Sequence, residues 1–205
     1  MLDLTNRTLI TESDIRSVQA GSTLRITLKA LVTPLAADLA RERHITLERV
    51  TPPAGHDHRP RRRIAIGADH GGFEMKEALK PLIEELGDEY LDCGTHSNAA
   101  VDYPDFAQAV ALAVARKTCD VGIMIDGAGI GSCMVANKVP GIRAAMCYDE
   151  ATARNSREHN GANVLTLGGK MISNDRMQDI VRVWLSTDLT EERHRRRVAK
   201  IDAML

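Results

Sequence analysis

The 205-residue chain has few aromatic residues, little net charge and few cysteines, and each shortage argues against a class of protein. Aromatic side chains are 3% of the residues and the formal net charge is −1, unlike a nucleic-acid binder with a basic face and stacking rings. The four cysteines have no CxxC spacing, so we expect free thiols rather than disulfides or a zinc site. No apolar run reaches the roughly 20 residues that span a membrane. The N-terminus does not resemble a secretory signal, so we expect a cytoplasmic globular protein.

A stretch rich in proline and arginine divides the chain. Residues 51–62 contain prolines, a glycine and basic side chains without apolar periodicity, which predicts a linker. We interpret His56 and His58 within it as solvated side chains rather than metal ligands. The linker separates a small α+β extension, residues 1–50, from a larger domain, residues 63–205.

The extension carries short helix and strand signals. A capping sequence at Thr11 and a Thr33-Pro34 pair each predict the start of a helix. With few large apolar side chains, a piece of this size should be marginal alone and should dock on another surface. The expected elements are a helix over 11–18, a strand in which Leu24, Ile26 and Leu28 point inward, a helix from 33 with Leu35, Ala36, Leu39 and Ala40 on one face, and a strand over 45–50.

The larger domain alternates short apolar runs with helical periodicity. This alternation predicts an α/β fold, a Rossmann-like, doubly wound parallel sheet covered by helices on both faces. Ligands of such sheets bind beyond the carboxyl ends of the strands, so the residues that follow each strand are the candidates for function. Strands are expected at 63–67, 89–92, 121–125, 142–146 and 164–167, with helices at 73–86, 106–116 and 177–185 among those between and after them.

Two predicted strands end in polar, glycine-rich loops. The first is followed by Asp69 and His70, which either face a substrate or cap the next helix and lie on the surface. The third ends at Asp126, followed by a loop that matches neither a P-loop nor a dinucleotide fingerprint. A carboxylate beside converging N–H groups suits proton abstraction from carbon with stabilisation of the resulting oxyanion, although a plain structural turn is the alternative.

Two further groups lie towards the C-terminus. His159 precedes Asn160 at the expected end of a helix, where an imidazole either serves as an acid or interacts with the helix dipole. Arg193 and Arg197 lie four residues apart, so on a helix they share one face. Two such guanidiniums suit a phosphate, although a basic tail helix without a ligand is also common.

Taken together, these motifs resemble the ribose-5-phosphate isomerase B family, which includes allose- and galactose-phosphate isomerases. The resemblance covers nearly all of residues 63–201. It implies a metal-free isomerase without cofactor that interconverts ribose 5-phosphate and ribulose 5-phosphate through a cis-enediolate. It also implies a homodimer, or a tetramer of paired dimers, with active sites shared between subunits. The matching strings are IAIGADHGGFEMKEALK, VDYPDFA, GIMIDGAGIGSCMVANKVPGIRAA, REHNGANVLTLGG and RHRRRV.

The resemblance also implies residue roles. Asp126 would be the proton-abstracting base, and His159 would protonate the ring oxygen to open the sugar. The sugar would be bound by Asp69, His70, Tyr103 and Asn160, the enediolate by the loop of Gly127, Gly129, Gly131 and Ser132, and the phosphate by Arg193, Arg197, Lys170 and His194, while Asn137 would support the glycine loop.

This chain departs from the family pattern at three positions. Asp126 replaces a cysteine that many members use as the base, Ala128 replaces a threonine, and Lys170 replaces an arginine. An aspartate is a weak base unless burial strengthens it, which makes Cys133 the alternative base. A six-carbon sugar phosphate, such as allose or galactose 6-phosphate, is therefore an alternative substrate. A sensor or scaffold without catalysis is the alternative from another class.

The extension lies outside this family. Its strings ITESDIR and ALVTPLAADLARER are similar to leading segments of enzymes housed in bacterial microcompartments. That likeness implies contacts with a shell or cargo protein and a location inside a microcompartment. The alternative is a small domain that supports the dimer.

Overall fold

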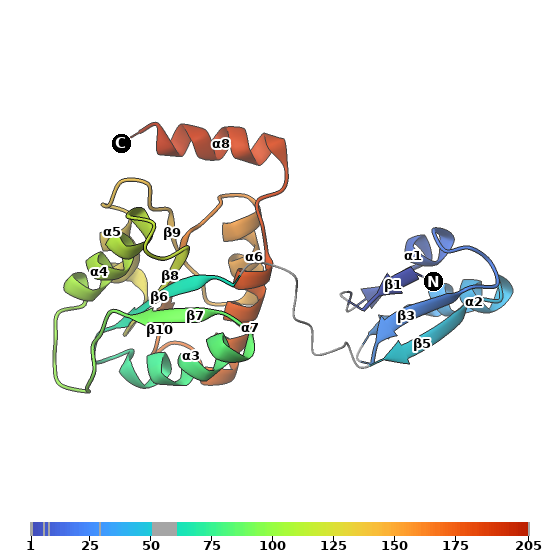
Figure 1. The fold of residues 1–205 in the computed structure, drawn as a ribbon, viewed down its shortest axis with the longest axis horizontal. Helices are drawn as coiled ribbons and strands as arrows, with labels where there is room; N and C mark the ends of the chain where they lie inside the picture. Colours follow the sequence, from blue (N-terminus) through green and yellow to red (C-terminus); the bar gives the residue numbers. More distant parts are fainter. Residues whose placement is uncertain (1, 6, 8, 29, 51–60, 205) are drawn as a thin grey trace. The chain divides into compact units, whose positions relative to one another are not determined.

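The computed structural model describes residues 2–5, 7, 9–28, 30–50 and 61–204. The described residues form two compact units, one within residues 2–50 and one within residues 61–204 (Figure 1). Most of the predicted linker, with His56 and His58, lies outside the described residues. None of the helices in the described ranges has the length and apolar character needed to span a bilayer.

The N-terminal unit repeats one strand–strand–helix segment. Leu2 pairs with Leu24 and Leu24 with Leu47, so the same sheet position recurs at a nearly constant interval. Neither this repeat nor the strands Leu2–Leu4, Leu9–Ile10 and Leu31–Val32 were predicted from the sequence. The main sheet is parallel, in the order β1 (Leu2–Leu4), β3 (Thr23–Thr27), β5 (Thr46–Val50); a second parallel pair joins β2 (Leu9–Ile10) and β4 (Leu31–Val32), and the helices are α1 (Glu12–Arg16) and α2 (Pro34–Glu42).

The helix starts in this unit are as expected, but two apolar positions are not. Thr33 accepts a hydrogen bond from Ala36 N–H at 3.2 Å and caps α2. The predicted inward positions of Leu28 and Leu35 are wrong, since their side chains are 54% and 58% exposed. β3 ends at Thr27, before Leu28. α2 buries its small residues Ala36 and Ala40 instead, because small side chains allow a helix to approach its neighbours closely.

The C-terminal unit confirms the predicted α/β fold. Its parallel sheet has the order β7-β6-β8-β10-β9, so the chain runs from β6 outward to β7 on one side, and on the other side it reaches the edge strand β9 before β10 fills the place beside β8. The strands are β6 (Arg63–Ala68), β7 (Glu89–Asp92), β8 (Val121–Asp126), β9 (Ala144–Met146) and β10 (Val164–Gly168). β9 begins two residues later than expected because Ile142 N–H bonds the carbonyl of Val139 in a turn.

Helices cover both faces of this sheet (Figure 1). One core cluster joins the sheet to α3, α6 and α7, and it includes the fully buried Trp184. A second cluster joins the other face to α4 and α5. The helices are α3 (Phe73–Glu85, which contains Pro81), α4 (Tyr103–Ala115), α5 (Ile130–Ala136), α6 (Glu150–Glu158), α7 (Asn174–Ser186) and α8 (Glu192–Asp202).

Candidate active site

Three loops meet at the carboxyl ends of β6, β8 and β10. Asp69 N–H donates to the carbonyl of Ile125 at 3.2 Å, which joins the first loop to the second strand. Gly169 N–H donates to the carbonyl of Asp126 at 2.7 Å, and Lys170 N–H donates to that of Gly127 at 3.1 Å. Asp69, Asp126 and Lys170 are therefore brought together, as the position rule for α/β sheets predicts.

Asp69 organises the loop that presents His70. The Asp69 carboxylate is buried, and its Oδ1 accepts hydrogen bonds from Gly71 N–H at 2.8 Å and Gly72 N–H at 3.0 Å. It therefore turns the chain into α3, which has Gly72 as its N-cap residue. His70 is exposed, and its Nδ1 lies 3.3 Å from the backbone N and O of Val101.

The Asp126 carboxylate is buried and fully hydrogen-bonded by its own loop. Oδ1 accepts from Ala128 N–H at 2.8 Å and from Gly129 N–H. Oδ2 accepts from Ser132 N–H at 3.0 Å and from the Ser132 hydroxyl. Each oxygen thus accepts two hydrogen bonds, which fills its usual capacity. Three amides expected to face an enediolate point to Asp126 instead, so proton abstraction requires one of these bonds to yield. The Ser132 hydroxyl can release its bond by rotation alone.

Two glycines allow this loop to fold tightly. Gly129, the N-cap of α5, has φ of 81°, a left-handed conformation that side chains disfavour. Gly131 lies against the ring of Tyr103, and a Cβ there would sit 2.6 Å from the ring atoms. Tyr103, the first residue of α4, therefore packs beside the glycine loop, and its predicted contact with the sugar stays a prediction.

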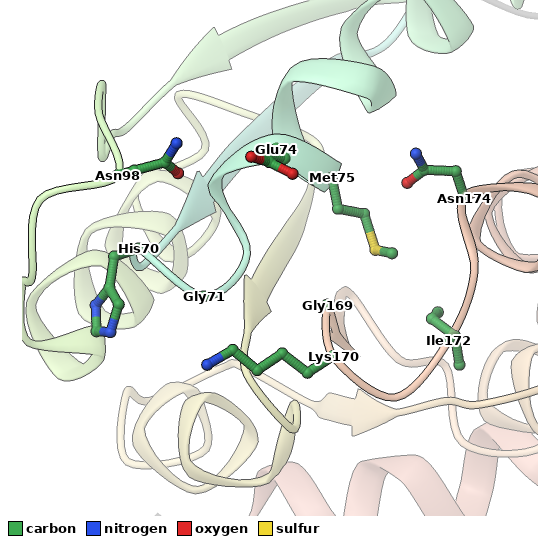
Figure 2. A pocket seen from close by; sticks show the side chains of 9 residues that line it. All are labelled: His70, Gly71, Glu74, Met75, Asn98, Gly169, Lys170, Ile172 and Asn174. Carbon is green, nitrogen blue, oxygen red and sulfur yellow. The ribbon is translucent and has the colours of Figure 1, made fainter.

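A cavity of about 480 Å³ opens beside these loops (Figure 2). Its lining includes the predicted His70 and Lys170, and Figure 2 shows the Lys170 side chain extending towards His70. Glu74, Asn98 and Asn174 add polar groups that the sequence analysis missed. All three lie near the carboxyl ends of strands, so the rule that located the other residues could have found them.

A buried ion pair anchors the segment that carries Asn98. Lys76 is fully buried, and its Nζ lies 2.8 and 2.6 Å from the two oxygens of Asp92. Asp92 also accepts from Gly94 N–H at 2.9 Å at the start of the loop. Burial tends to raise the pKa of Asp92, but hydrogen bonds from Lys76 and Lys80 outweigh it and lower the pKa to about 2. A buried lysine has no sequence signature, so the pattern could not reveal this pair.

The second group of predicted residues, which includes His159 and Asn160, lies near the amino ends of the strands, opposite the loops that hold Asp126. α6 starts after β9 ends and runs back to the point where β10 begins, so His159, its C-cap residue, lies where the strands start. Asn160 follows it. Asp126 ends β8, level with Gly168 at the far end of β10. A five-residue strand spans about 16 Å, so one chain does not bring His159 to its own Asp126.

The basic helix α8 belongs to this second group. His194 stacks on His159 with ring centroids 4.3 Å apart, and its side chain is buried, which gives a ligand no access to it in this chain. Arg193 and Arg197 are exposed, as phosphate binding requires, and Arg193 Nε also lies 2.5 Å from Glu191. The predicted phosphate ligands are thus divided, with Lys170 beside His70 and the two arginines near His159.

Cys133 has a structural environment on α5. Its Sγ lies 3.4 Å from the carbonyl of Ala144 and donates to it. Asn137 donates from Nδ2 to the carbonyls of Cys133 at 3.0 Å and Ala144 at 2.9 Å, and its Oδ1 accepts from Ala144 N–H. The cysteine therefore takes part in the contact between α5 and β9, whereas Asp126 ends β8 and accepts hydrogen bonds from the glycine loop.

Comparison with known proteins gives one consistent result. Residues 64–201 match the family model described as Ribose/Galactose Isomerase. Ribose-5-phosphate isomerase B of Escherichia coli is 41% identical over 70% of this chain and 96% of its own. The Clostridium thermocellum ribose-5-phosphate isomerase B structure is 48% identical, with a TM-score of 0.68 over 69% of this chain and 96% of that one. The Mycoplasma genitalium enzyme with bound ribulose-5-phosphate is 37% identical, with a TM-score of 0.67 over 69% and 95%. Other curated relatives carry only the broader name of sugar phosphate isomerase, given provisionally.

Proposed function

Since this chain belongs to the ribose/galactose isomerase family, we propose that it interconverts ribose 5-phosphate and ribulose 5-phosphate through a cis-enediolate. The observation that carries the proposal is the meeting of Asp69, Asp126 and Lys170 at the carboxyl ends of three neighbouring strands. This arrangement supplies a carboxylate base and a cation for phosphate beside one cavity that also contains His70.

The chemistry follows from the placement of these groups. Lys170 and His70 hold the phosphate end of the open-chain sugar, and the Asp126 carboxylate takes the proton from C2. The electron pair moves into an enediolate, and the same carboxyl group returns the proton to C1. A water or a hydroxyl group carries the proton of O2 to O1, so that C2 becomes the carbonyl and C1 carries the hydroxyl. When the Ser132 hydroxyl rotates away, Oδ2 of Asp126 regains a lone pair for this step. Any amide of the glycine loop released at the same time can donate to the enediolate oxygens.

The working site combines two copies of the chain. Asp126 and His159 lie at opposite sheet edges of one protomer, yet ring opening and proton transfer require an acid and a base on one substrate. We propose a homodimer in which His159, Asn160, Arg193 and Arg197 of one protomer complete the Asp126 site of its partner. Exposed arginines on α8 can then reach a phosphate held by the partner subunit's Lys170.

The first experiment measures the interconversion of ribose 5-phosphate and ribulose 5-phosphate by the purified full chain with EDTA present. Allose 6-phosphate and galactose 6-phosphate are measured beside them. Turnover of the pentose, at a kcat/KM well above that of the hexoses, supports the proposal. Faster turnover of a hexose phosphate would mean that this sugar, and not ribose 5-phosphate, is the substrate. The cavity beyond Lys170 would then be the region to examine.

Mixing two impaired variants, assayed at a low substrate concentration, tests the shared site. The Asp126→Asn variant lacks the base, and the Arg197→Ala variant binds the substrate phosphate more weakly, so each homodimer should be impaired. A heterodimer formed by refolding the two together contains one site with both residues intact. We expect mixing to restore up to a quarter of the activity of the unmodified protein. Half of the dimers are heterodimers, and each heterodimer has one intact site out of two. If activity does not return although mass spectrometry shows heterodimers, each site belongs to one protomer.

The hydrogen bonding of Asp126 favours one other function. A carboxylate saturated by its own loop suits a protein that binds a sugar phosphate without turnover. Binding of ribose 5-phosphate by calorimetry, without conversion of any sugar phosphate in the EDTA assay, would support that function. Replacing Asp126 by cysteine, the base of many relatives that this chain resembles, should then create activity.

A further inference from the structure

The imidazole of His159 contacts two side chains. Asn155, one helical turn earlier in α6, places its Nδ2 3.1 Å from Nδ1 of His159. The imidazole of His194 in α8 stacks on the His159 imidazole almost in parallel, with 11° between the ring planes. Neither contact was expected from the sequence, because the stack joins two helices and Asn155 belongs to no recognised motif. Together they restrain both the rotation of the His159 ring and the position of its proton.

The orientation of the Asn155 amide follows from a third residue. Asn160 places its Nδ2 3.4 Å from Oδ1 of Asn155, and an amide nitrogen is a donor. Oδ1 of Asn155 therefore accepts from Asn160, and its Nδ2 donates to His159. A neutral imidazole that accepts at Nδ1 carries its proton on Nε2. The Asn160–Asn155–His159 chain thus selects one tautomer of the ring.

His194 supplies a flat, uncharged partner. Its side chain is 3% exposed, and its Nε2 forms no hydrogen bond with the described residues, although Glu191 Oε2 lies 3.7 Å away. Burial lowers the pKa of His194, and the neighbouring His159, Arg193 and Arg197 lower it further, against the opposing effect of Glu191. A neutral His194 ring fixes the plane of His159 without adding a repelling charge.

We propose that Asn155 and His194 are positioning residues that hold His159 in its Nε2–H tautomer, so that Nε2 donates the proton that opens the sugar ring. The Nε2 proton passes to the ring oxygen as its bond to C1 breaks. The anomeric hydroxyl forms the carbonyl and passes its proton through a water back to Nε2, so the imidazole ends neutral and the sugar gains one proton and loses one. The catalytic consequence rests on the proposed isomerase function, whereas the tautomer belongs to the free protein.

The test measures the tautomer by imidazole nitrogen-15 spectra of the full chain, at a pH where the His159 ring is neutral, with a His159→Gln variant to assign the signals. We expect the Nε2–H form in the unmodified protein. In Asn155→Asp a carboxylate accepts at Nδ1, so the proton should move to Nδ1. The exposed His44 should not change and serves as the reference within each spectrum. Gln19→Glu, the same amide-to-carboxylate change on an exposed residue of the N-terminal unit, is the matched control.

Kinetics supply the second readout. Asn155→Asp should lower kcat for ribose 5-phosphate about tenfold, a fraction of what a general acid contributes, and change KM less than about twofold. His194→Ala should lower kcat similarly, and His194→Phe, which keeps a flat ring, should restore most of it. An Nδ1–H ring in the unmodified protein, or an unchanged tautomer in Asn155→Asp, would overturn the inference. An Nε2–H ring that responds to Asn155→Asp in a protein without turnover would support the tautomer and reject the isomerase function.

Discussion

The two units of this chain both contain parallel sheets, but they bury them differently. β8 and β10 of the C-terminal unit are buried at every position, whereas β3 of the N-terminal unit alternates between buried and half-exposed residues. The outer face of that smaller sheet aligns Asp3, Arg25 and Glu48, with Arg25 Nε 2.9 Å from Glu48. Charged side chains thus occupy a face that parallel sheets usually cover with helices.

Because of this difference, the C-terminal unit forms a site at the ends of its strands, whereas the N-terminal unit exposes an apolar surface. In the C-terminal unit, helices occupy both faces, so the loops at the strand ends are where polar groups converge. The N-terminal unit instead exposes leucines, and Leu9 and Leu31 are neighbours in the β2–β4 ladder with 49% and 71% of their side chains exposed. Its predicted role in docking to a shell, to cargo or to the dimer therefore concerns this surface and remains a prediction.

The largest expected effect tests whether catalysis belongs to the C-terminal unit alone. Asp126→Asn should reduce turnover at least about a thousandfold, because the amide cannot accept the C2 proton. Removal of residues 1–60 should change kcat less than about twofold. Steady-state assays with ribose 5-phosphate measure both, and the melting temperature of Asp126→Asn shows whether the loop survives the loss of its carboxylate. If Asp126→Asn remains active and Cys133→Ala does not, the base is Cys133.

A pair of core substitutions compares the two sheets directly. Ile66 in β6 and Ile26 in β3 are both fully buried. Ile66→Ala should lower the free energy of unfolding of its unit by about 3 to 4 kcal/mol, as a large cavity does. Trp184 is the only tryptophan in the chain and lies in the C-terminal core, so its fluorescence reports on that unit alone. Ile26→Ala should leave the fluorescence transition unchanged. A shift there would show that the two units unfold together.

Acid should weaken the C-terminal unit through Asp92. The folded pKa of about 2 lies below the unfolded value of about 3.9, so this carboxylate stabilises the fold above pH 4 and loses that effect as the pH falls to about 2. The contribution is at most about 3 kcal/mol, measured by urea unfolding followed through Trp184 fluorescence at several pH values. Asp92→Asn should remove this part of the pH dependence. An equal slope in the variant would assign the acid sensitivity to other carboxylates.

The smallest effect is expected on the exposed leucines. Leu31→Ser should change the stability of the N-terminal unit by less than about 0.5 kcal/mol, because its side chain is already in contact with solvent. The matched change Ile10→Ser, at the buried neighbour of Leu9, should unfold the unit. Urea unfolding of both variants, followed by circular dichroism, compares them. A large loss in Leu31→Ser would mean that this surface is covered in solution.

Local patterns predicted much of the fold and the loops of the site. Alternating periodicities placed all five strands of the C-terminal sheet, and the strand-end rule placed Asp69, His70 and Asp126 on one edge. Burial within the small unit was harder, because Leu28 and Leu35 match an inward pattern yet are exposed. Periodicity tells which residues share a face, but the neighbours that cover that face are set by tertiary packing.

The sequence by itself determined the α/β class, the family, the glycine loop and the identity of the candidate acid and base, because these depend on residue types at short spacing. Tertiary structure alone decided what those groups contact. It turned the loop amides onto Asp126, buried Lys76 against Asp92, stacked His194 on His159, and placed His159 and Asp126 at opposite edges of the sheet. These contacts join segments far apart in the chain or depend on which way a loop folds, and no local pattern encodes such geometry.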